Sequence, residues 1–141
     1  MALTNLSSLS ISEKIGYGGP VDGSGNEIVQ TPPIGGAVTQ ITNRSTGVEL
    51  NKPCGTITTH NASLAAEASA SFVVTNSTVA ATDVVVVSIK SGSNGGGTIV
   101  SVSAVAAGSF TIRVHNGNVA AGTAETGAIA INFAVIKSVA S

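Results

Sequence analysis

The sequence is poor in aromatic and charged side chains. It has no tryptophan, one tyrosine and three phenylalanines, and Asp, Glu, Lys and Arg together make up 9% of its 141 residues. Soluble domains usually contain about 25% charged residues, so this surface must consist mainly of Ser, Thr, Asn, Gly and exposed alanine. Alanine and valine each bury little area, so a core built from them is only weakly stabilising. Such a chain gains stability from contact with copies of itself or with a partner.

Clustered basic charge, long apolar spans and paired cysteines are also absent. The net charge is −1, and the six basic residues are spread from Lys14 to Lys137, so we expect no nucleic-acid partner. No run of about 20 apolar residues is present, which excludes a transmembrane helix. The stretch MALTNLSSLSIS lacks the basic and apolar regions of a signal peptide, so we expect synthesis in a cytoplasm and no membrane partner. Cys54 is the single cysteine and has no internal partner for a disulfide.

Residues 1–36 differ in composition from the rest of the chain. They contain seven of the 17 glycines and three of the four prolines, with little strand-like pattern. We therefore predict an extended N-terminal arm over residues 1–36 and a β domain over residues 37–141. A disordered leader is the alternative to an arm that becomes ordered along another subunit. The apolar residues that would anchor the arm are Ile11, Ile15, Tyr17, Val21 and Ile28.

From residue 37 onward the apolar residues recur with the two-residue period of β-strands. In SFTIRVH, residues 109–115, Phe110, Ile112 and Val114 share one face. Several such runs without crossover helices predict an all-β, antiparallel β-sandwich, and jelly-roll-like and Ig-like arrangements both fit. Turn-forming residues predict hairpins at residues 43–47 and at the dipeptide 116–117.

One run, TDVVVVSIK, is apolar on both faces because it contains four consecutive valines, Val84 to Val87. A central strand of a sandwich has one face on the core, so the other face needs a separate cover. We expect Val84 and Val86 to form an apolar strip with Ala130 and Ala134 of the last strand. Such a strip usually marks an interface, here with a neighbouring subunit. The alternative is that the chain's own loops or its N-terminal arm cover it.

The sequence offers no pattern typical of catalysis or of cofactor binding. None of the seven carboxylates has a neighbour at the spacing of an acid/base pair, and Asp83 fits a turn at the start of a strand. His60 and His115 stand alone, without the cysteines or carboxylates that would complete a metal site. Cys54 reads as a small buried apolar residue, and no serine lies in a nucleophile motif. We expect no catalytic residue, no cofactor and no metal ion.

Four stretches resemble a recurrent module of tailed-bacteriophage structural proteins. They are VTQITNRSTGVELNKPCGTITTH, FVVTNSTVAATDVVVVSI, SVSAVAAGSFTIRVHN and AIAINFAVIK, and the resemblance covers about residues 37–141. Small all-β phage proteins of this size resemble the head decoration, or cement, proteins. The resemblance implies a non-enzymatic protein on the outer capsid of the virion that binds the major capsid protein and bridges its subunits. It also implies a homo-oligomer, with a trimer as the first expectation and a dimer as the second.

Two other functions remain as alternatives. A tail fibre or spike domain that binds a receptor glycan would need aromatic platforms, and the chain has only Tyr17, Phe72, Phe110 and Phe133. The three phenylalanines fall on the expected core faces, which disfavours this role. A glycan hydrolase would need two carboxylates facing each other in a cleft, and the sequence does not pair them.

Overall fold

The computed structural model describes residues 34–94, 96–120 and 122–138, which form eight strands and no helix. None of these residues belongs to a helix long and apolar enough to cross a membrane. The expected all-β class is confirmed. The strands are β1 (Gly35–Thr39), β2 (Val48–Glu49), β3 (Cys54–Thr58), β4 (Ser69–Thr75), β5 (Val84–Ser91), β6 (Thr98–Ala106), β7 (Ser109–Asn116) and β8 (Ala130–Ile136).

The predicted N-terminal arm lies outside the described residues, up to residue 33. Its proposed anchors Ile11, Ile15, Tyr17, Val21 and Ile28 lie there too, so their role stays a prediction. The first described strand, β1, begins at Gly35, within the segment that we assigned to the arm.

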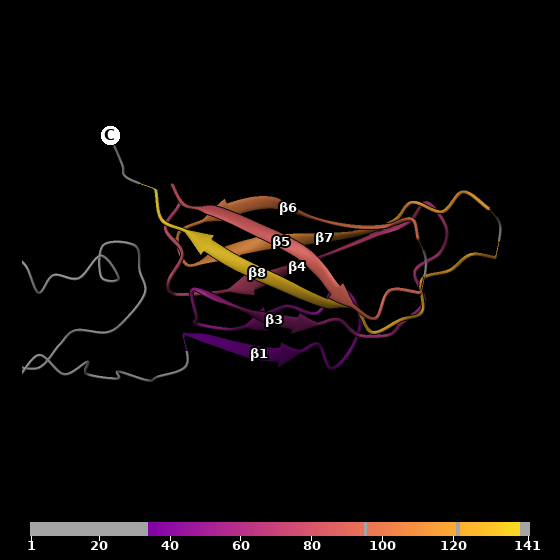
Figure 1. The fold of residues 1–141 in the computed structure, drawn as a ribbon, viewed down its shortest axis with the longest axis horizontal. Coiled ribbons are helices and arrows are strands. Elements are labelled where there is room, and N and C mark those ends of the chain that lie inside the picture. The colour runs from indigo at the N-terminus through magenta and orange to yellow at the C-terminus, as the bar shows by residue number, and fades with distance from the viewer. Residues whose placement is uncertain (1–33, 95, 121, 139–141) are drawn as a thin grey trace, which may run out of the picture. The chain divides into compact units, whose positions relative to one another are not determined.

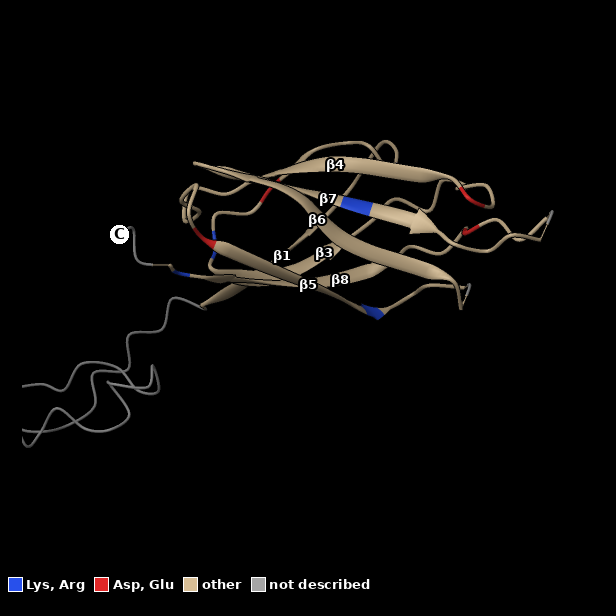
Figure 2. Ribbon diagram, turned by 90° about the horizontal axis from the view of Figure 1, so that it is seen from above, with Lys and Arg blue, Asp and Glu red and all other residues tan. Residues whose placement is uncertain are grey.

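The strands form two mixed sheets of four, which lie as two layers (Figures 1 and 2). One sheet has the order β1-β3-β8-β5 and the other the order β2-β4-β7-β6. Their inner faces share one apolar core, in which the rings of Phe110 on β7 and Phe133 on β8 lie 5.3 Å apart, centre to centre. Figure 2 also shows how few charged positions the two sheets carry.

The prediction of purely antiparallel sheets is wrong for two strand pairs. β1 runs parallel to β3, and β2 runs parallel to β4. The physical reason is that the chain alternates between the sheets from β1 to β6, so each strand reverses direction in the opposite layer. Strands that are two apart in the sequence then become neighbours with the same direction. The connection between the two parallel strands therefore contains a strand of the other sheet, where a βαβ unit would contain a helix.

Both predicted hairpins are also wrong. Residues 40–47 connect β1 to β2, which belong to different sheets, and Asn116 ends β7 before a long connection to β8 in the other sheet. The tight hairpin among the described residues is β6–β7, where Ala106 lies opposite Ser109. Its loop contains Gly108 with φ at 78°, a left-handed conformation that glycine adopts without strain.

The alternation of the strands is confirmed where the sequence shows it most clearly. Phe110, Ile112 and Val114 are buried, whereas Arg113 between them is exposed. In β5, Val85 is buried and Val84 and Val86 are exposed, so the valine run does have two different faces. Our placement of this run in a central strand is wrong, because β5 is the last strand of its sheet.

Replacing Phe133 by alanine should remove its ring contact with Phe110, which joins the two layers. We expect the free energy of unfolding to fall by about 3–5 kcal/mol, since a buried ring is lost and a cavity is left in the core. Urea denaturation measures this loss. Val73→Ala is the control, because Val73 is 48% exposed on an outer face, and it should cost less than about 1 kcal/mol. Equal losses for the two variants would contradict the shared core.

Candidate interaction surface

The outer face of sheet β1-β3-β8-β5 is apolar where β5 and β8 pair. Val84 lies opposite Ile136, and Val86 lies opposite Ala134. Val84 is 52% exposed, Val86 46% and Ile136 54%. We call the outward residues Val84, Val86, Ala134 and Ile136 the β5–β8 patch. The structure therefore brings Val84, Val86 and Ala134 together, as the sequence predicted, and adds Ile136, which that prediction did not include.

Ala130 also lies on β8, but at the other end of the strand, opposite Ser91. The face between it and the patch is polar but uncharged. Ser88 pairs with Asn132, and Thr56 of β3 donates from its hydroxyl to Asn132 Oδ1 over 2.8 Å. Neither 84–89 nor 130–136 contains an ionisable side chain.

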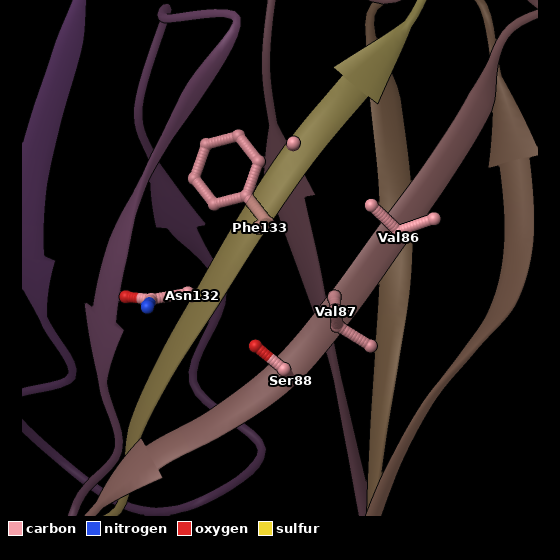
Figure 3. A pocket seen from close by; sticks show the side chains of 6 residues that line it. Val86, Val87, Ser88, Asn132 and Phe133 are labelled. Carbon is pink, nitrogen blue, oxygen red and sulfur yellow. The ribbon is translucent and has the colours of Figure 1, made fainter.

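A hollow of about 220 Å³ lies along the β5–β8 pair, lined by Val86, Val87, Ser88, Asn132, Phe133 and Ala134. Figure 3 labels five of these residues along the paired strands β5 and β8, with the Phe133 ring beside β8. The lining offers one amide and one hydroxyl side chain and no acid or base. It is suited to contact with another apolar surface rather than to chemistry.

A line of paired residues runs across this sheet from the patch to the start of β1. Gly35 lies opposite Cys54 of β3, Cys54 lies opposite Ala134 of β8, and Ala134 lies opposite Val86 of β5. Cys54 is half-buried rather than buried, because it stands on this outer face and not in the core. The first strand and the patch therefore lie on one sheet, with β8 of the patch two strand spacings from β1, about 10 Å, and β5 three, about 14 Å.

The outer face of the second sheet differs in character. There Arg113 donates from Nε and Nη2 to Ser69 Oγ over 3.1 and 2.8 Å, and Ser69 Oγ lies 3.0 Å from His115 Nδ1. Because Ser69 accepts two bonds from the guanidinium, its hydroxyl hydrogen is available to the imidazole. This face also exposes Val73 and Ile99, but the row of Ser71, Arg113 and Ser101 lies between them, so they form no continuous apolar patch.

A buried carboxylate and a buried guanidinium lie at the end of the sheets where β7 ends and β8 begins. Glu125 Oε2 accepts from Thr98 Oγ1 over 2.6 Å and from Ser93 Oγ over 2.8 Å. Its Oε1 accepts from the backbone N–H groups of Gly127 over 2.8 Å and Asn94 over 3.2 Å. The carboxylate thus joins the β5–β6 connection to the β7–β8 connection.

Arg44, in the β1–β2 connection, holds the β3–β4 and β7–β8 connections. Its guanidinium donates to Thr59 Oγ1 over 3.1 Å, to the Glu125 carbonyl over 3.1 Å and to the Gly127 carbonyl over 2.8 Å. Burial lowers the pKa of Arg44, and the negative charge of Glu125 partly opposes that shift. Sequence reasoning missed both residues because it looked for carboxylates only as acid/base pairs and for basic residues only as a patch. The signal that could have found them was their rarity. In a chain with so few charged residues, a charged residue in a predicted loop is a candidate for a structural role.

The opposite end of the sheets is held by Asp83. Its Oδ2 accepts from the Ala80 N–H over 2.8 Å and from Lys137 Nζ over 2.6 Å. The hydrogen bond from Ala80 and the one from Lys137 lower the pKa of Asp83, against the raising effect of burial. The predicted role of Asp83 in a turn before the valine strand is confirmed.

The titratable residues do not gather into a metal site among residues 34–94, 96–120 and 122–138. No group of three or more His, Cys, Asp or Glu side chains in this part of the chain has the arrangement of a metal site. His60 follows β3 and His115 lies in β7, on different sheets. His60 Nδ1 accepts from the Ala62 N–H over 2.9 Å, so this ring supports a turn.

The chain was compared with family models and with curated proteins, and its fold with solved structures, and none of the three comparisons finds a match. The geometry above therefore carries the functional argument, together with the resemblance seen in the sequence.

Glu125→Gln should destabilise the fold at neutral pH. The glutamine amide would place a donor among four donors, which leaves buried groups unsatisfied at about 1–3 kcal/mol. Urea denaturation at pH 7 measures this. Glu67→Gln is the control, because Glu67 is exposed in the neighbouring β3–β4 connection and its loss should be nearly neutral. A neutral Glu125→Gln would contradict the role of this carboxylate as an anchor.

The same variant should respond less to acid. Burial raises the pKa of Glu125, but the bonds from Thr98, Ser93, Gly127 and Asn94 outweigh it, so its pKa lies below the ordinary value of 4.5. A carboxylate with a lower pKa when folded stabilises the fold above about pH 4.5 and loses that contribution as the pH falls further. Unfolding midpoints from pH 7 downward should therefore fall less in Glu125→Gln than in the wild type. Some loss should remain, because Asp83 also has a lowered pKa.

Proposed function

We propose that the chain is a non-enzymatic virion structural protein of the capsid decoration, or cement, class. It binds the outer surface of the capsid, bridges major capsid subunits and stabilises the shell. The observation that carries the proposal is the exposed, uncharged β5–β8 patch on one outer face of the fold. The resemblance of residues 37–141 to phage structural modules supplies the class of partner.

The two layers support a β-sandwich of the jelly-roll-like type. Eight strands in two sheets of four are the number expected for a jelly roll, whereas Ig-like sandwiches have seven or nine strands. The parallel pairs β1–β3 and β2–β4 depart from both patterns, so the fold is a variant.

The patch fits adhesion to a flat protein surface. Val84, Val86 and Ile136 are each about half exposed, and burying them stabilises a complex without removing any charge from water. Ala134 has a short side chain, so a partner can approach the β8 backbone closely. The neighbouring Ser88 and Asn132 offer hydrogen bonds at the rim of the contact. This combination of an apolar centre and a polar rim is usual for protein interfaces.

The tail fibre or spike receptor-binding domain stays as the second candidate. The polar cluster of Arg113, Ser69 and His115 on the other outer face favours it, because these groups suit an acidic or hydroxyl-rich ligand. The copy number of the protein separates the two roles.

Copy number in purified source particles tests the proposed function. A decoration protein covers the shell, so we expect a ratio to the most abundant shell protein within a few-fold of one. Quantitative mass spectrometry of intact particles measures it. A ratio of a few copies per hundred shell subunits would reject decoration and favour a fibre or spike.

Val86→Lys should abolish binding of the protein to shells that lack it. The charge would enter an apolar contact at the centre of the patch and cost several kcal/mol on burial. Cosedimentation with such shells measures binding. Val73→Lys is a matched control, since Val73 is 48% exposed, against 46% for Val86, and faces outward from the other sheet. Equal binding by both variants would contradict the role of the patch, and a lower native mass of Val86→Lys would assign it to a second copy.

A further inference from the structure

The two sheets have four edge strands, and three of them carry features that block further pairing. β5 has a register shift between Ile89 and Ser91 and exposes Lys90 between them. β6 has a register shift between Val102 and Ala104, and β2 is only two residues long. Bulges, charges and short length are the usual protection of sheet edges.

The fourth edge strand, β1, has none of these features. Its five residues, GGAVT, keep a continuous register with β3 and include no proline and no charge. Among the described residues it pairs with β3 alone, and its other side is the end of the sheet. An edge of this kind is a template for another strand.

The backbone of β1 presents its free groups at alternate residues. Gln40 N–H donates to the Thr58 carbonyl over 2.9 Å, so the even-numbered residues of this segment face β3. In a strand, the N–H and C=O of one residue point to the same side, and the next residue points to the other. Gly35, Ala37 and Thr39 therefore direct their backbone groups away from β3, toward the open edge.

Two exposed isoleucines flank this edge. Ile34 precedes β1 and is 72% exposed, and Ile41 follows it closely and is 83% exposed. They are more exposed than any residue of the β5–β8 patch. Apolar side chains exposed to water at both ends of an open strand edge indicate that this edge is an interface.

We propose that β1 pairs with β1 of a second copy of this chain, antiparallel, about a two-fold axis through Ala37. The register follows from the free groups, because Ala37 meets its own counterpart and Gly35 meets Thr39. All three outward-facing residues are then matched, which gives about six backbone hydrogen bonds across the axis. The two β1-β3-β8-β5 sheets become one sheet of eight strands.

The residues around β1 favour a second copy of this chain as the partner. Residues 34–43, IGGAVTQITN, contain no charge, so two-fold pairing brings no like charges together. Gly35 and Ala37 have little or no side chain to hinder a second sheet. Antiparallel pairing also sets the start of one strand against the end of the other, so Ile34 of one copy lies near Ile41 of the second at both ends of the joint.

This joint goes beyond the proposed function, because it uses a different part of the molecule from the β5–β8 patch and does not depend on a capsid. It predicts a dimer in place of the trimer that the resemblance implies. One strand pair and four isoleucines bury a small area, so the dimer is weak and forms with rising concentration.

Ala37→Pro tests the joint in the full chain. Proline removes one N–H per copy at the centre of the pairing, and that N–H is not used with β3, so an edge strand tolerates the change. Sedimentation equilibrium over a wide concentration range should show a dimer for the wild type and a dimer affinity lower by about tenfold or more for Ala37→Pro. Ala37→Thr keeps the N–H and should dimerise like the wild type. A wild type that stays monomeric, forms a trimer, or dimerises equally well as Ala37→Pro would overturn the proposal.

Amide exchange of the wild type gives a second test that requires no variant. The Ala37 amide faces the open edge and the Val38 amide faces β3. In NMR-detected exchange, Val38 should be protected at every concentration, and Ala37 should become protected only where the dimer is populated. Protection of Ala37 that does not change with concentration, or rapid exchange of Ala37 in the dimer, would reject the β1 joint even if Ala37→Pro failed to fold.

Discussion

Six of the seven connections between consecutive strands cross from one sheet to the other, and the fold depends on holding these crossings in place. The apolar core contains Val, Ile, Leu and Phe rather than the Ala and Val that the composition suggested, and it lies mainly between the strands, so it contributes little to holding the crossings at the ends of the sheets. The buried polar residues of the described chain supply the rest: Gln40, Arg44, Thr59, Asn76, Asp83, Asn116 and Glu125. Each lies in a connection or at the end of a strand, and none lies in the middle of a sheet. Their hydrogen bonds fix loops to loops, so the polar interior is placed where the chain changes layer.

This arrangement leaves the outer faces free to differ. With the crossings anchored from inside, neither outer face needs polar groups for the sake of the fold. One face carries Arg113 with its hydroxyl and imidazole neighbours, and the other carries the uncharged β5–β8 patch. The proposed shell contact and the proposed β1 joint both use the sheet β1-β3-β8-β5. The shell contact uses its outer face, and the joint uses its β1 edge. A weakly charged protein can in this way hold two kinds of contact on one sheet.

The sequence was sufficient to predict which side chains point inward, and insufficient to predict which strands pair. Alternation with a two-residue period indicates which face of a strand each side chain occupies, so Phe110, Ile112 and the two faces of the valine run were assigned correctly. It carries no information about the neighbour across the ladder, so the parallel pairs and the edge position of β5 were missed. Asn116 shows the same limit in a single residue. Asn-Gly is typical of a hairpin turn, yet here the Asn116 amide donates to the carbonyls of Leu64, Ala65 and Thr123 and ties two connections together.

The pairing of Gly35 with Cys54 and of Cys54 with Ala134 brings the two ends of the described domain close together. Because β1 starts and β8 finishes on either side of β3, the chain enters and leaves the two sheets about 10 Å apart. A domain with adjacent ends can be carried within a surface loop of a host protein without forcing that loop open. Close ends also favour circular permutation, in which the two ends are joined and the chain is opened at another loop. The placement of β1 and β8 on either side of β3 thus makes the described domain compatible with insertion into another chain as one unit.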